Sequence, residues 1–292
     1  MDRKIIGIVV IYKPDIDKLV YNINKYINDI SYLIIWDNSS ILNSERKIIL
    51  EKCVNHEKIC FAGNGINQGL GIAFNYALNI AIRDEYEFLM TMDQDSEWQN
   101  FPNYLSIINK ITDSKIAIFG PKVLNAFENY SLEKYYSNCE ISSTEFVISS
   151  GAVYKVDILS SIGGFAEEYF IDAIDEEVCY RAHANGYDTV IVNSSFLLQE
   201  FGLYKKRKIF GKSVATSNYS PFRYYHITRN HLWLARSIYV NRKQKKLMIY
   251  NYVLAPAVKI LLFEENKLEK IIAIFKGIVD GILKKSLERR KI

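Results

Sequence analysis

The spacing of hydrophobic residues in the first 200 positions predicts an α/β fold. Residues 5–12 (IIGIVVIY) form a continuous apolar and β-branched run, which is typical of a strand buried on both faces. Apolar residues then recur at helical spacing over residues 15–28. Alternation of this kind indicates a sheet with helices packed on its faces. Further strands are predicted at residues 32–36, 59–62, 88–92 and 116–119, and a helix at residues 69–82.

The second half of the chain is less regular and becomes helical toward its end. Short elements are predicted at residues 146–149 and 152–156 (strands), 175–185 (helix), and 187–192 and 196–201 (extended). Long helices are predicted beyond residue 217, at residues 224–240, 247–263 and 268–287. We therefore expect a catalytic domain of residues 1–205 and a helical C-terminal region of residues 206–292 that packs on it.

The composition is that of a globular protein, but its charge is unevenly distributed. Hydrophobic residues make up 49% of the chain and charged residues 24%, and the four cysteines form no CxxC pair, so no zinc site is expected. Residues 205–292 carry 21 Lys/Arg and 5 Asp/Glu, a net charge of +16, whereas residues 1–204 carry 16 and 28, a net charge of −12. The basic region is either a solvated helical face or a surface for an anionic partner. It lacks a nucleic-acid-binding motif, so no nucleic-acid partner is expected.

Acidic residues follow two of the predicted strands, at the positions where an open α/β sheet binds its ligands. Asp93 and Asp95 flank a single glutamine directly after the strand at residues 88–92. Two carboxylates one residue apart suit a hard divalent cation, Mg²⁺ or Mn²⁺, that also contacts a diphosphate. Asp37 follows the strand at residues 32–36 and either contacts a nucleotide or forms a turn with the sequence DNSS.

Two further polar segments carry candidate functional residues. Residues 67–71 (NQGLG) lead into a predicted helix, where glycines either allow a phosphate to approach the backbone or simply form a capped loop. Residues 172–177 (DAIDEE) contain four acids in six positions. Asp175 among them is a candidate N-cap, and one carboxylate here could serve as a general base. Glu177 and Arg181 are spaced to form a helical ion pair.

Taken in order, these motifs resemble the family-2 inverting glycosyltransferases, which have the GT-A fold. The similarity extends over about residues 5–235 and consists of the segments IGIVVIY, DNSS, NQGLGIAFN, DQDS, SSGAVY, GGF, FIDAIDEEVCYRA and SPFRYYHITRN. DQDS, FIDAIDE and YYHITRN together are most similar to the bacterial rhamnosyltransferase branch, which uses dTDP-L-rhamnose in O-antigen or capsule assembly. The resemblance implies a GT-A-type nucleotide-binding mixed sheet flanked by helices, with a C-terminal helical extension.

The resemblance also implies roles for individual residues. Asp175 matches the family's catalytic aspartate and would take the proton of the acceptor hydroxyl in a single inverting displacement. Asp95 would bind Mg²⁺ or Mn²⁺, and Asp93 would contribute to the same site. The nucleotide-sugar donor would be bound by residues from several motifs, namely Asp37, Asn67, Gly69, Gly71, Asp93 and Gly151.

The sequence departs from the family pattern in two places. Ile174 precedes Asp175 where a glutamate is usual, and Gln199 stands where many members carry a histidine three residues before a glycine. If that histidine helps to hold the metal or the diphosphate, another group must take its part here. Arg223 and Arg229 are the basic residues that we expect to contact the diphosphate instead.

The C-terminal region suggests contact with a membrane. Apolar residues form one broad stripe over residues 268–287, as in a helix that either packs on the catalytic domain or lies in a membrane interface. Residues 247–263 are short for a transmembrane helix. With the charge of +16 and no signal peptide, we expect a cytoplasmic protein attached peripherally to the anionic inner face of the cell membrane. Such a location suits a lipid-linked saccharide acceptor.

Three other functions are compatible with the sequence. The donor could be a UDP-hexose rather than dTDP-rhamnose, within the same fold. A sugar nucleotidyltransferase would also place acids on a sheet, but it usually has a glycine- and arginine-rich loop where this chain has YKPD at residues 12–15. A catalytically inactive sugar-nucleotide-binding subunit is the third, and Gln199 is the feature that would support it.

Overall fold

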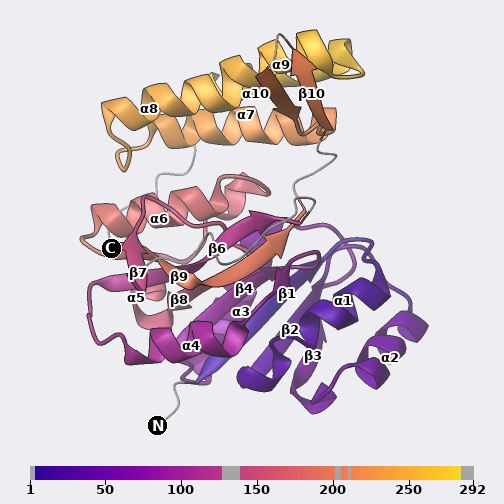
Figure 1. Cartoon of the computed structure of the whole chain (residues 1–292), viewed down its shortest axis with the longest axis vertical. Helices are drawn as coiled ribbons and strands as arrows, with labels where there is room; N and C mark the ends of the chain where they lie inside the picture. Colours follow the sequence, from indigo (N-terminus) through magenta and orange to yellow (C-terminus); the bar gives the residue numbers. More distant parts are fainter. Residues whose placement is uncertain (1–3, 127–138, 201–204, 210–211, 284–292) are drawn as a thin grey trace. The chain divides into compact units, whose positions relative to one another are not determined.

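The computed structural model describes residues 4–126, 139–200, 205–209 and 212–283, and these residues form two compact units. The first unit contains residues 4–167 and 174–200, and the second contains the described residues beyond 200 (Figure 1). The second unit also includes Glu168–Ala173, a short segment that the sequence pattern does not separate from its neighbours. The chain therefore passes from one unit to the other at this segment as well as near residue 200.

A mixed sheet forms the centre of the first unit. Its strands follow the order β3-β2-β1-β4-β8-β6-β9-β5, with β7 also paired to β9. Strands β3, β2, β1 and β4 are parallel, whereas β8 is antiparallel to both of its neighbours, so the expected mixed sheet is confirmed. The strands are β1 (Ile5–Ile11), β2 (Tyr32–Asp37), β3 (Ile59–Ala62), β4 (Phe88–Asp93), β5 (Glu97–Trp98), β6 (Ile116–Asn125), β7 (Ile141–Ser143), β8 (Ala152–Lys155) and β9 (Asp188–Gln199).

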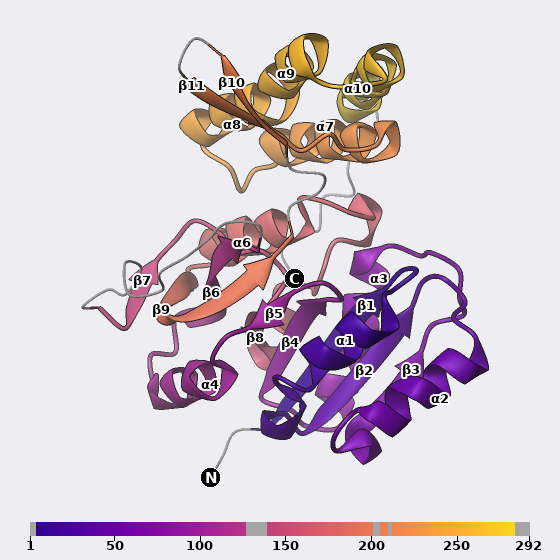
Figure 2. The ribbon, with the colours of Figure 1, turned by 45° about the vertical axis from the view of Figure 1, so that its right-hand side comes forward.

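Helices cover both faces of this sheet (Figures 1 and 2). One face packs against α1 (Ile16–Ile23), α2 (Asn43–Lys52) and α4 (Phe101–Lys110), whose apolar residues share one core with alternate residues of β1 and β2. The other face is covered by α3 (Leu70–Arg83), α5 (Val156–Ser161) and α6 (Ile174–Ala184). On that side Phe165 contacts both Phe74 of α3 and Tyr154 of β8, each at a ring distance of 5.1 Å.

Two sequence predictions within the first unit are corrected. Residues 146–149 form a loop rather than a strand, because backbone groups of Phe146 and Ser149 bond to the side chains of Thr144 and Asp175; Val147 of this loop packs against Gly120. A Cβ on Gly120 would approach Cγ1 of Val147 to 2.4 Å, so this contact depends on glycine. The two extended segments predicted at 187–192 and 196–201 are parts of one strand, β9, which ends at Gln199.

The second unit consists mainly of helices. It contains the antiparallel strands β10 (Lys205–Ile209) and β11 (Lys212–Thr216), then α7 (Pro221–Arg236), α8 (Arg242–Ile249), the π-helix η5 (Tyr250–Leu254), α9 (Ala255–Phe263) and α10 (Lys267–Leu283). Helices α7 and α10 approach closely through two glycines. A Cβ on Gly277 would lie 2.8 Å from the carbonyl oxygen of Tyr225, and one on Gly281 would lie 2.9 Å from Cβ of Leu232.

One lysine of α10 belongs neither to a solvated face nor to a surface for an anionic partner, the two alternatives for the basic region. Lys270 is buried, and its Nζ lies 2.9 Å from Oε2 of Glu264. The hydroxyl of Tyr224 donates to Oε1 of the same glutamate at 2.7 Å. This buried charge pair is satisfied by hydrogen bonds, as a charge in a protein interior must be.

Candidate active site

The carboxyl ends of β1, β2 and β4 bring two of the predicted site residues to one edge of the sheet. Asp93 is paired in register with Val10 of β1, and Asp37 is paired with Ile11 on the other side of the same strand. With neighbouring strands about 4.8 Å apart, the two aspartates are separated by roughly 10 Å across the end of β1. The two predicted strand ends therefore meet at a single edge of the sheet.

Asp37 is occupied by the turn that follows β2. Its side chain is fully buried, and it accepts hydrogen bonds from the backbone N–H groups of Ser39 (2.8 Å) and Ile41 (3.0 Å) and from Arg46 (3.2 Å). Burial alone would raise the pKa of Asp37, but these donors outweigh it and lower the pKa below its usual value. The geometry thus assigns Asp37 to the DNSS turn, and its contact with a nucleotide stays a prediction.

The NQGLG segment forms a structured loop at the start of α3. Oδ1 of Asn67 accepts from the N–H of Gly69 at 3.1 Å, and Gly69 precedes the helix with φ +83°, a backbone that favours glycine. The structure explains Gly71 by packing, and its predicted contact with the donor stays a prediction. A Cβ there would lie 2.7 Å from Cα of Glu167, so Gly71 permits close packing of α3 against the chain at residues 166–167.

The acidic triplet Asp93-Gln94-Asp95, at the end of β4, is fixed through its central residue, Gln94. Gln94 accepts from the N–H of Tyr12 at 2.7 Å and donates to the carbonyl oxygen of Tyr12 at 3.2 Å. Asn22 of α1 donates to the Gln94 carbonyl oxygen at 3.2 Å. The glutamine is thereby tied to β1 and α1, and Asp93 and Asp95 on either side of it are partly exposed.

A short serine loop connects the triplet to the predicted base. The N–H of Asp93 donates to Oγ of Ser150 at 3.1 Å, and the N–H of Ser149 donates to Oδ2 of Asp175 at 3.1 Å. Asp175 also accepts from the N–H of Glu176 at 3.0 Å, in the first turn of α6. Two adjacent residues thus join the predicted metal ligand to the predicted base.

Gly151, which follows this loop, is needed for packing inside the unit. It has φ +77°, and a Cβ there would lie 2.9 Å from Trp98 and 2.9 Å from Pro121. Its N–H donates to the carbonyl oxygen of Thr91 at 2.8 Å. The structure therefore explains this glycine by contacts with buried side chains, and the predicted approach to the donor sugar stays a prediction.

The expected ion pair of α6 is present and buried. Arg181 donates to both carboxylate oxygens of Glu177, at 2.8 and 2.7 Å, and both side chains are almost completely buried. The guanidinium also donates to the carbonyl oxygens of Ile162 and Gly164. Glu177 is therefore a structural residue that, through Arg181, joins α6 to the loop containing the GGF motif (residues 163–165). Asp175, two positions earlier, is only partly buried.

Gln199 lies at the end of β9, beside the triplet. Its Nε2 donates to Oδ2 of Asp93 at 2.8 Å, and because a carboxylate only accepts, the amide nitrogen must face the aspartate. Its Oε1 is buried and has no hydrogen-bond partner among the described residues. Gln199, which stands where the resemblance implies a histidine, therefore has an unpartnered oxygen next to the predicted metal ligand Asp93.

Arg223 and Arg229 are both engaged within the second unit. Arg223 donates to Oδ1 of Asp172 at 3.2 Å. Arg229 donates to the carbonyl oxygens of Glu168 and Tyr169, each at 3.2 Å, and its guanidinium lies over the ring of Trp233. These contacts hold the segment Glu168–Ala173, and the predicted contact of the two arginines with a diphosphate stays a prediction.

Several residues of this site were not among the sequence predictions. Ser149 and Ser150 belong to the SSGAVY motif, which could have indicated that they lie near the site. The position of a serine in a sequence does not by itself indicate a role. Gln94 stands between two carboxylates, and nothing in its segment indicates its hydrogen bonds to Tyr12. In each case the partner lies 26 to 82 residues away in the chain, a separation that periodicity cannot reveal.

Comparison with known proteins supports the expected class. No known family model matches the chain. The dTDP-rhamnosyl transferase RfbF of Shigella flexneri is 26% identical over an alignment of 302 positions, which covers 97% of this chain and 96% of the relative. The predicted resemblance to the rhamnosyltransferase branch is thereby confirmed along nearly the whole chain.

Solved structures show the same architecture. The mannosyltransferase PcManGT from Pyrobaculum calidifontis, in complex with GDP-Man and Mn²⁺, has a TM-score of 0.62 and 12% identity, covering 99% of this chain and 89% of that chain. TarS 1–349 from S. aureus, in complex with UDP-GlcNAc, has a TM-score of 0.58 and 14% identity, covering 95% and 81%. The fold is therefore the GT-A fold of glycosyltransferases. Within that class, this chain is a homologue of a dTDP-rhamnosyl transferase.

Proposed function

We propose that this chain transfers L-rhamnose from dTDP-L-rhamnose to a saccharide acceptor during the synthesis of a surface polysaccharide. The observation that carries the proposal is the similarity to a dTDP-rhamnosyl transferase over 97% of the chain. A UDP-hexose donor is the alternative, and it is favoured by the UDP-GlcNAc bound in the structurally similar TarS.

The transfer would proceed in one step at the edge of the sheet. The acceptor hydroxyl oxygen forms a bond to the anomeric carbon while the bond from that carbon to the diphosphate oxygen breaks, so the configuration inverts. Asp175 takes the hydroxyl proton, and the nucleoside diphosphate leaves with the bonding electrons. The position of Asp175 in the first turn of α6 supports this role, because the helix dipole favours the ionised carboxylate that a base requires.

The residues beside Asp175 fit a hard divalent cation such as Mg²⁺ or Mn²⁺. Asp93 and Asp95 would hold it, and the buried, unpartnered Oε1 of Gln199 adds a third oxygen next to Asp93. No group of three His, Cys, Asp or Glu side chains within the described ranges forms a metal centre by itself. A site with two carboxylates and one amide oxygen suits ions that keep water and substrate phosphates among their ligands. When bound, such a cation would neutralise charge on the departing diphosphate.

We further propose that the second unit binds the anionic inner face of the cell membrane. Helix residues Arg242–Phe263 form a continuous 22-residue run that is long and apolar enough to cross a membrane by length and composition, and only 17% of its apolar window is buried. Five of its exposed apolar residues recur at intervals of three or four, namely Leu247, Tyr250, Leu254, Val258 and Leu261, and Leu262 follows the last of them. This spacing places them on one side of the run.

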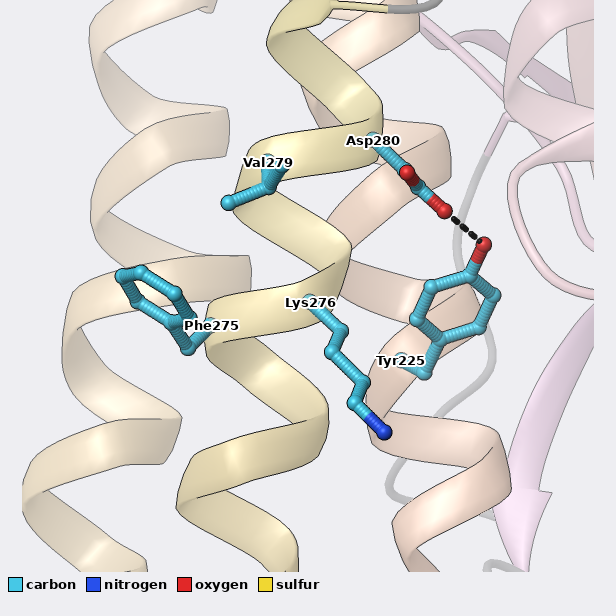
Figure 3. A pocket seen from close by; sticks show the side chains of 5 residues that line it. All are labelled: Tyr225, Phe275, Lys276, Val279 and Asp280. Carbon is cyan, nitrogen blue, oxygen red and sulfur yellow. Dashed lines mark hydrogen bonds between the residues drawn. The ribbon is translucent and has the colours of Figure 1, made fainter.

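Helix α10 carries a second exposed apolar stripe, formed by Leu268, Ile272, Phe275, Ile282 and Leu283. Figure 3 shows Phe275 and Val279 on one side of α10, and Lys276, Asp280 and Tyr225 of α7 on the other, around an open depression of about 530 Å³. The first turn of α8 is basic and begins with Arg242 and Lys243. Apolar stripes bordered by basic residues are typical of helices that lie in an anionic membrane interface.

A peripheral position on the membrane supports a lipid-linked acceptor. The donor is a soluble nucleotide sugar, so it reaches the site from the cytoplasm, whereas a lipid-linked saccharide is confined to the bilayer. Binding to the same surface would raise the local concentration of the acceptor at the site. The cytoplasmic and peripheral location predicted from the sequence is part of this proposal.

The donor is tested by thermal-shift binding of dTDP, UDP and GDP, each with and without Mn²⁺, followed by transfer assays with dTDP-L-rhamnose and UDP-hexoses. We expect the largest shift with dTDP and Mn²⁺, and transfer from dTDP-L-rhamnose. A preference for UDP would replace the rhamnosyl proposal by the UDP-hexose alternative. Release of diphosphate from a nucleoside triphosphate, without sugar transfer, would indicate a nucleotidyltransferase.

A further inference from the structure

The segment Glu168–Ala173 has a backbone that its own residues do not favour. Phe170, Asp172 and Ala173 have φ values of +64°, +63° and +64°, in the left-handed region that non-glycine residues rarely adopt. A conformation of this kind persists only where surrounding contacts determine it. The next two residues of the chain are Ile174, the first residue of α6, and Asp175.

Asn230 of α7 supplies the most direct of these contacts. Its side-chain NH₂ group lies within hydrogen-bond distance of the carbonyl oxygens of Tyr169 (2.7 Å), Ile171 (2.6 Å) and Asp172 (2.9 Å), so its two N–H bonds are shared among three acceptors. The Asn230 side chain is completely buried, so no water competes for these three acceptors. One side chain thus binds the backbone on both sides of Phe170 and immediately before Ala173.

Other residues of α7 also contact the same segment. Arg223 pairs with Asp172 at 3.2 Å, His226 stacks on Phe170 at a ring distance of 5.3 Å, and Trp233 meets the Tyr169 ring edge to face at 5.9 Å. These residues and Asn230 recur at intervals of three or four and so form one face of the helix. The FIDAIDEE and SPFRYYHITRN motifs therefore meet here, within the second unit.

We propose that Asn230 is a positioning residue for Asp175. By fixing the left-handed backbone that ends at Ala173, it determines where α6 begins and therefore where the carboxylate in the first turn of that helix lies. Asn230 acts only through the segment that it holds. The inference rests on the proposed role of Asp175 as the base of the transfer reaction.

The experiment compares Asn230→Ala with Ala173→Gly, the double variant and a matched control. Glycine adopts positive φ at little cost, so Ala173→Gly should make the segment less dependent on Asn230. Tyr224→Phe is the control, because it removes a buried hydrogen bond of α7 to Glu264, away from the segment. Steady-state kinetics with donor and acceptor is combined with hydrogen exchange of the amides in residues 168–176.

We expect Asn230→Ala to lower kcat by about 100-fold, because a displacement of a catalytic group by about 1 Å can reduce the rate by this factor. The donor KM should change little. Exchange over residues 168–176 should become faster, and Ala173→Gly should restore part of kcat in the double variant. Tyr224→Phe should lower the melting temperature but leave kcat unchanged. Wild-type exchange and kcat in folded Asn230→Ala, or an equal loss of kcat in Tyr224→Phe, would overturn the inference.

The exchange measurement needs no substrate, so it separates the two proposals. If the unmodified protein transfers no sugar while Asn230→Ala still accelerates exchange at residues 168–176, the proposed function fails and the contact of Asn230 with the segment stands. If the unmodified protein is active and Asn230→Ala changes neither kcat nor exchange, only the positioning role fails.

Discussion

Nε2 of Gln199 donates to Oδ2 of Asp93 across 2.8 Å, from the end of β9 to the end of β4. This bond directs the amide nitrogen toward the aspartate and leaves the buried Oε1 of Gln199 without a partner in the described part of the chain. An unsatisfied buried oxygen is costly, and costs of this kind are typical of sites completed by a ligand. The buried group that Gln199 offers beside Asp93 is therefore an oxygen.

The first prediction concerns this oxygen. We expect Gln199→Ala to weaken Mn²⁺ binding in the presence of nucleotide by tenfold or more, in the range of about 10–100-fold known for groups that support metal ligands. Electron paramagnetic resonance titration of Mn²⁺ measures this directly, without turnover. Gln99→Ala changes an exposed glutamine of the same unit and should have no effect. Equal Mn²⁺ affinity in both variants would exclude a role for Gln199.

Asp175 should be essential for the chemical step. Replacing it by asparagine removes the proton acceptor but keeps the shape, so kcat should fall by about 10²–10⁴-fold while donor binding changes little. Asp157→Asn is a matched control, because Asp157 also accepts from the N–H of the next residue in the first turn of a helix, at 2.8 Å. Full activity in Asp175→Asn would exclude Asp175 as the base. If the activity is that of a complex containing this chain and the variant leaves it unchanged, the inactive-subunit alternative is supported.

The Glu177–Arg181 pair should be important for folding rather than for catalysis. Glu177→Gln leaves a buried guanidinium without its carboxylate, which costs about 3–5 kcal/mol of unfolding free energy. Urea denaturation measures this loss. The exposed pair Arg83–Asp84 offers the comparison, and Asp84→Asn should leave the unfolding midpoint unchanged. A Glu177→Gln protein as stable as the wild type would show that the buried pair contributes nothing.

His226 predicts a pH dependence of stability. Burial, and next the charge of Arg229, lower the pKa of His226 from 6.5 to about 4. Between these values the folded state binds fewer protons than the unfolded state, so stability rises with pH from about 4 to 6.5, by at most about 3 kcal/mol. Tyr225 is the other titratable ring that contacts His226.

Melting curves at pH 4.5 and pH 7 test this prediction with His226→Phe, which keeps an aromatic ring against Phe170 but cannot be protonated. We expect this variant to lose less stability than the wild type on acidification, whereas His56→Gln, at an exposed histidine, should behave as the wild type does. Identical pH profiles for wild type and His226→Phe would contradict the prediction.

The membrane surface is tested by sedimentation with vesicles. We expect the protein to bind vesicles that contain phosphatidylglycerol more strongly than pure phosphatidylcholine, and to be released by high salt. The double variant Leu261→Glu, Leu262→Glu should reduce binding, because it places two charges in the exposed stripe of α9. Ile82→Glu, at an exposed apolar residue of α3, is the control. Absence of wild-type binding at low salt would remove the membrane from the proposed function.

Most of the strands that could be predicted from sequence are buried on both faces, although β3 is only partly buried. The strands β1, β2, β3, β4 and β6 all read as apolar runs, since helices cover the sheet on each side. Helix α2 (NSERKIILEK) was not predicted, because it buries only Ile49 and has almost no apolar face to detect. The strand predicted at residues 146–149 was wrong, because backbone groups of Phe146 and Ser149 bond to side chains, those of Thr144 and Asp175.

The candidate site could be predicted only for residues whose role is indicated by their own sequence segment. The carboxylates of Asp93 and Asp175 stand out in their own segments, and their positions at a strand end and a helix start agree with the structure. Gly71 and Gly151 also stand out, but the contacts that require glycine there come from distant residues, so the sequence cannot tell close packing from a ligand pocket. Positive φ at Phe170 leaves no sequence signal at all, because no glycine marks it.

The hydrogen bonds of Asn230 to residues 169–172 have a consequence for folding during synthesis on the ribosome. The ribosome synthesises Glu168–Ala173 before α7, so for a time the three left-handed residues have no Asn230 to hold them. Until α7 emerges, the nascent chain lacks the support for the first turn of α6. On our proposal, the chain would acquire transferase activity late in translation, together with the helices that we expect to bind the membrane.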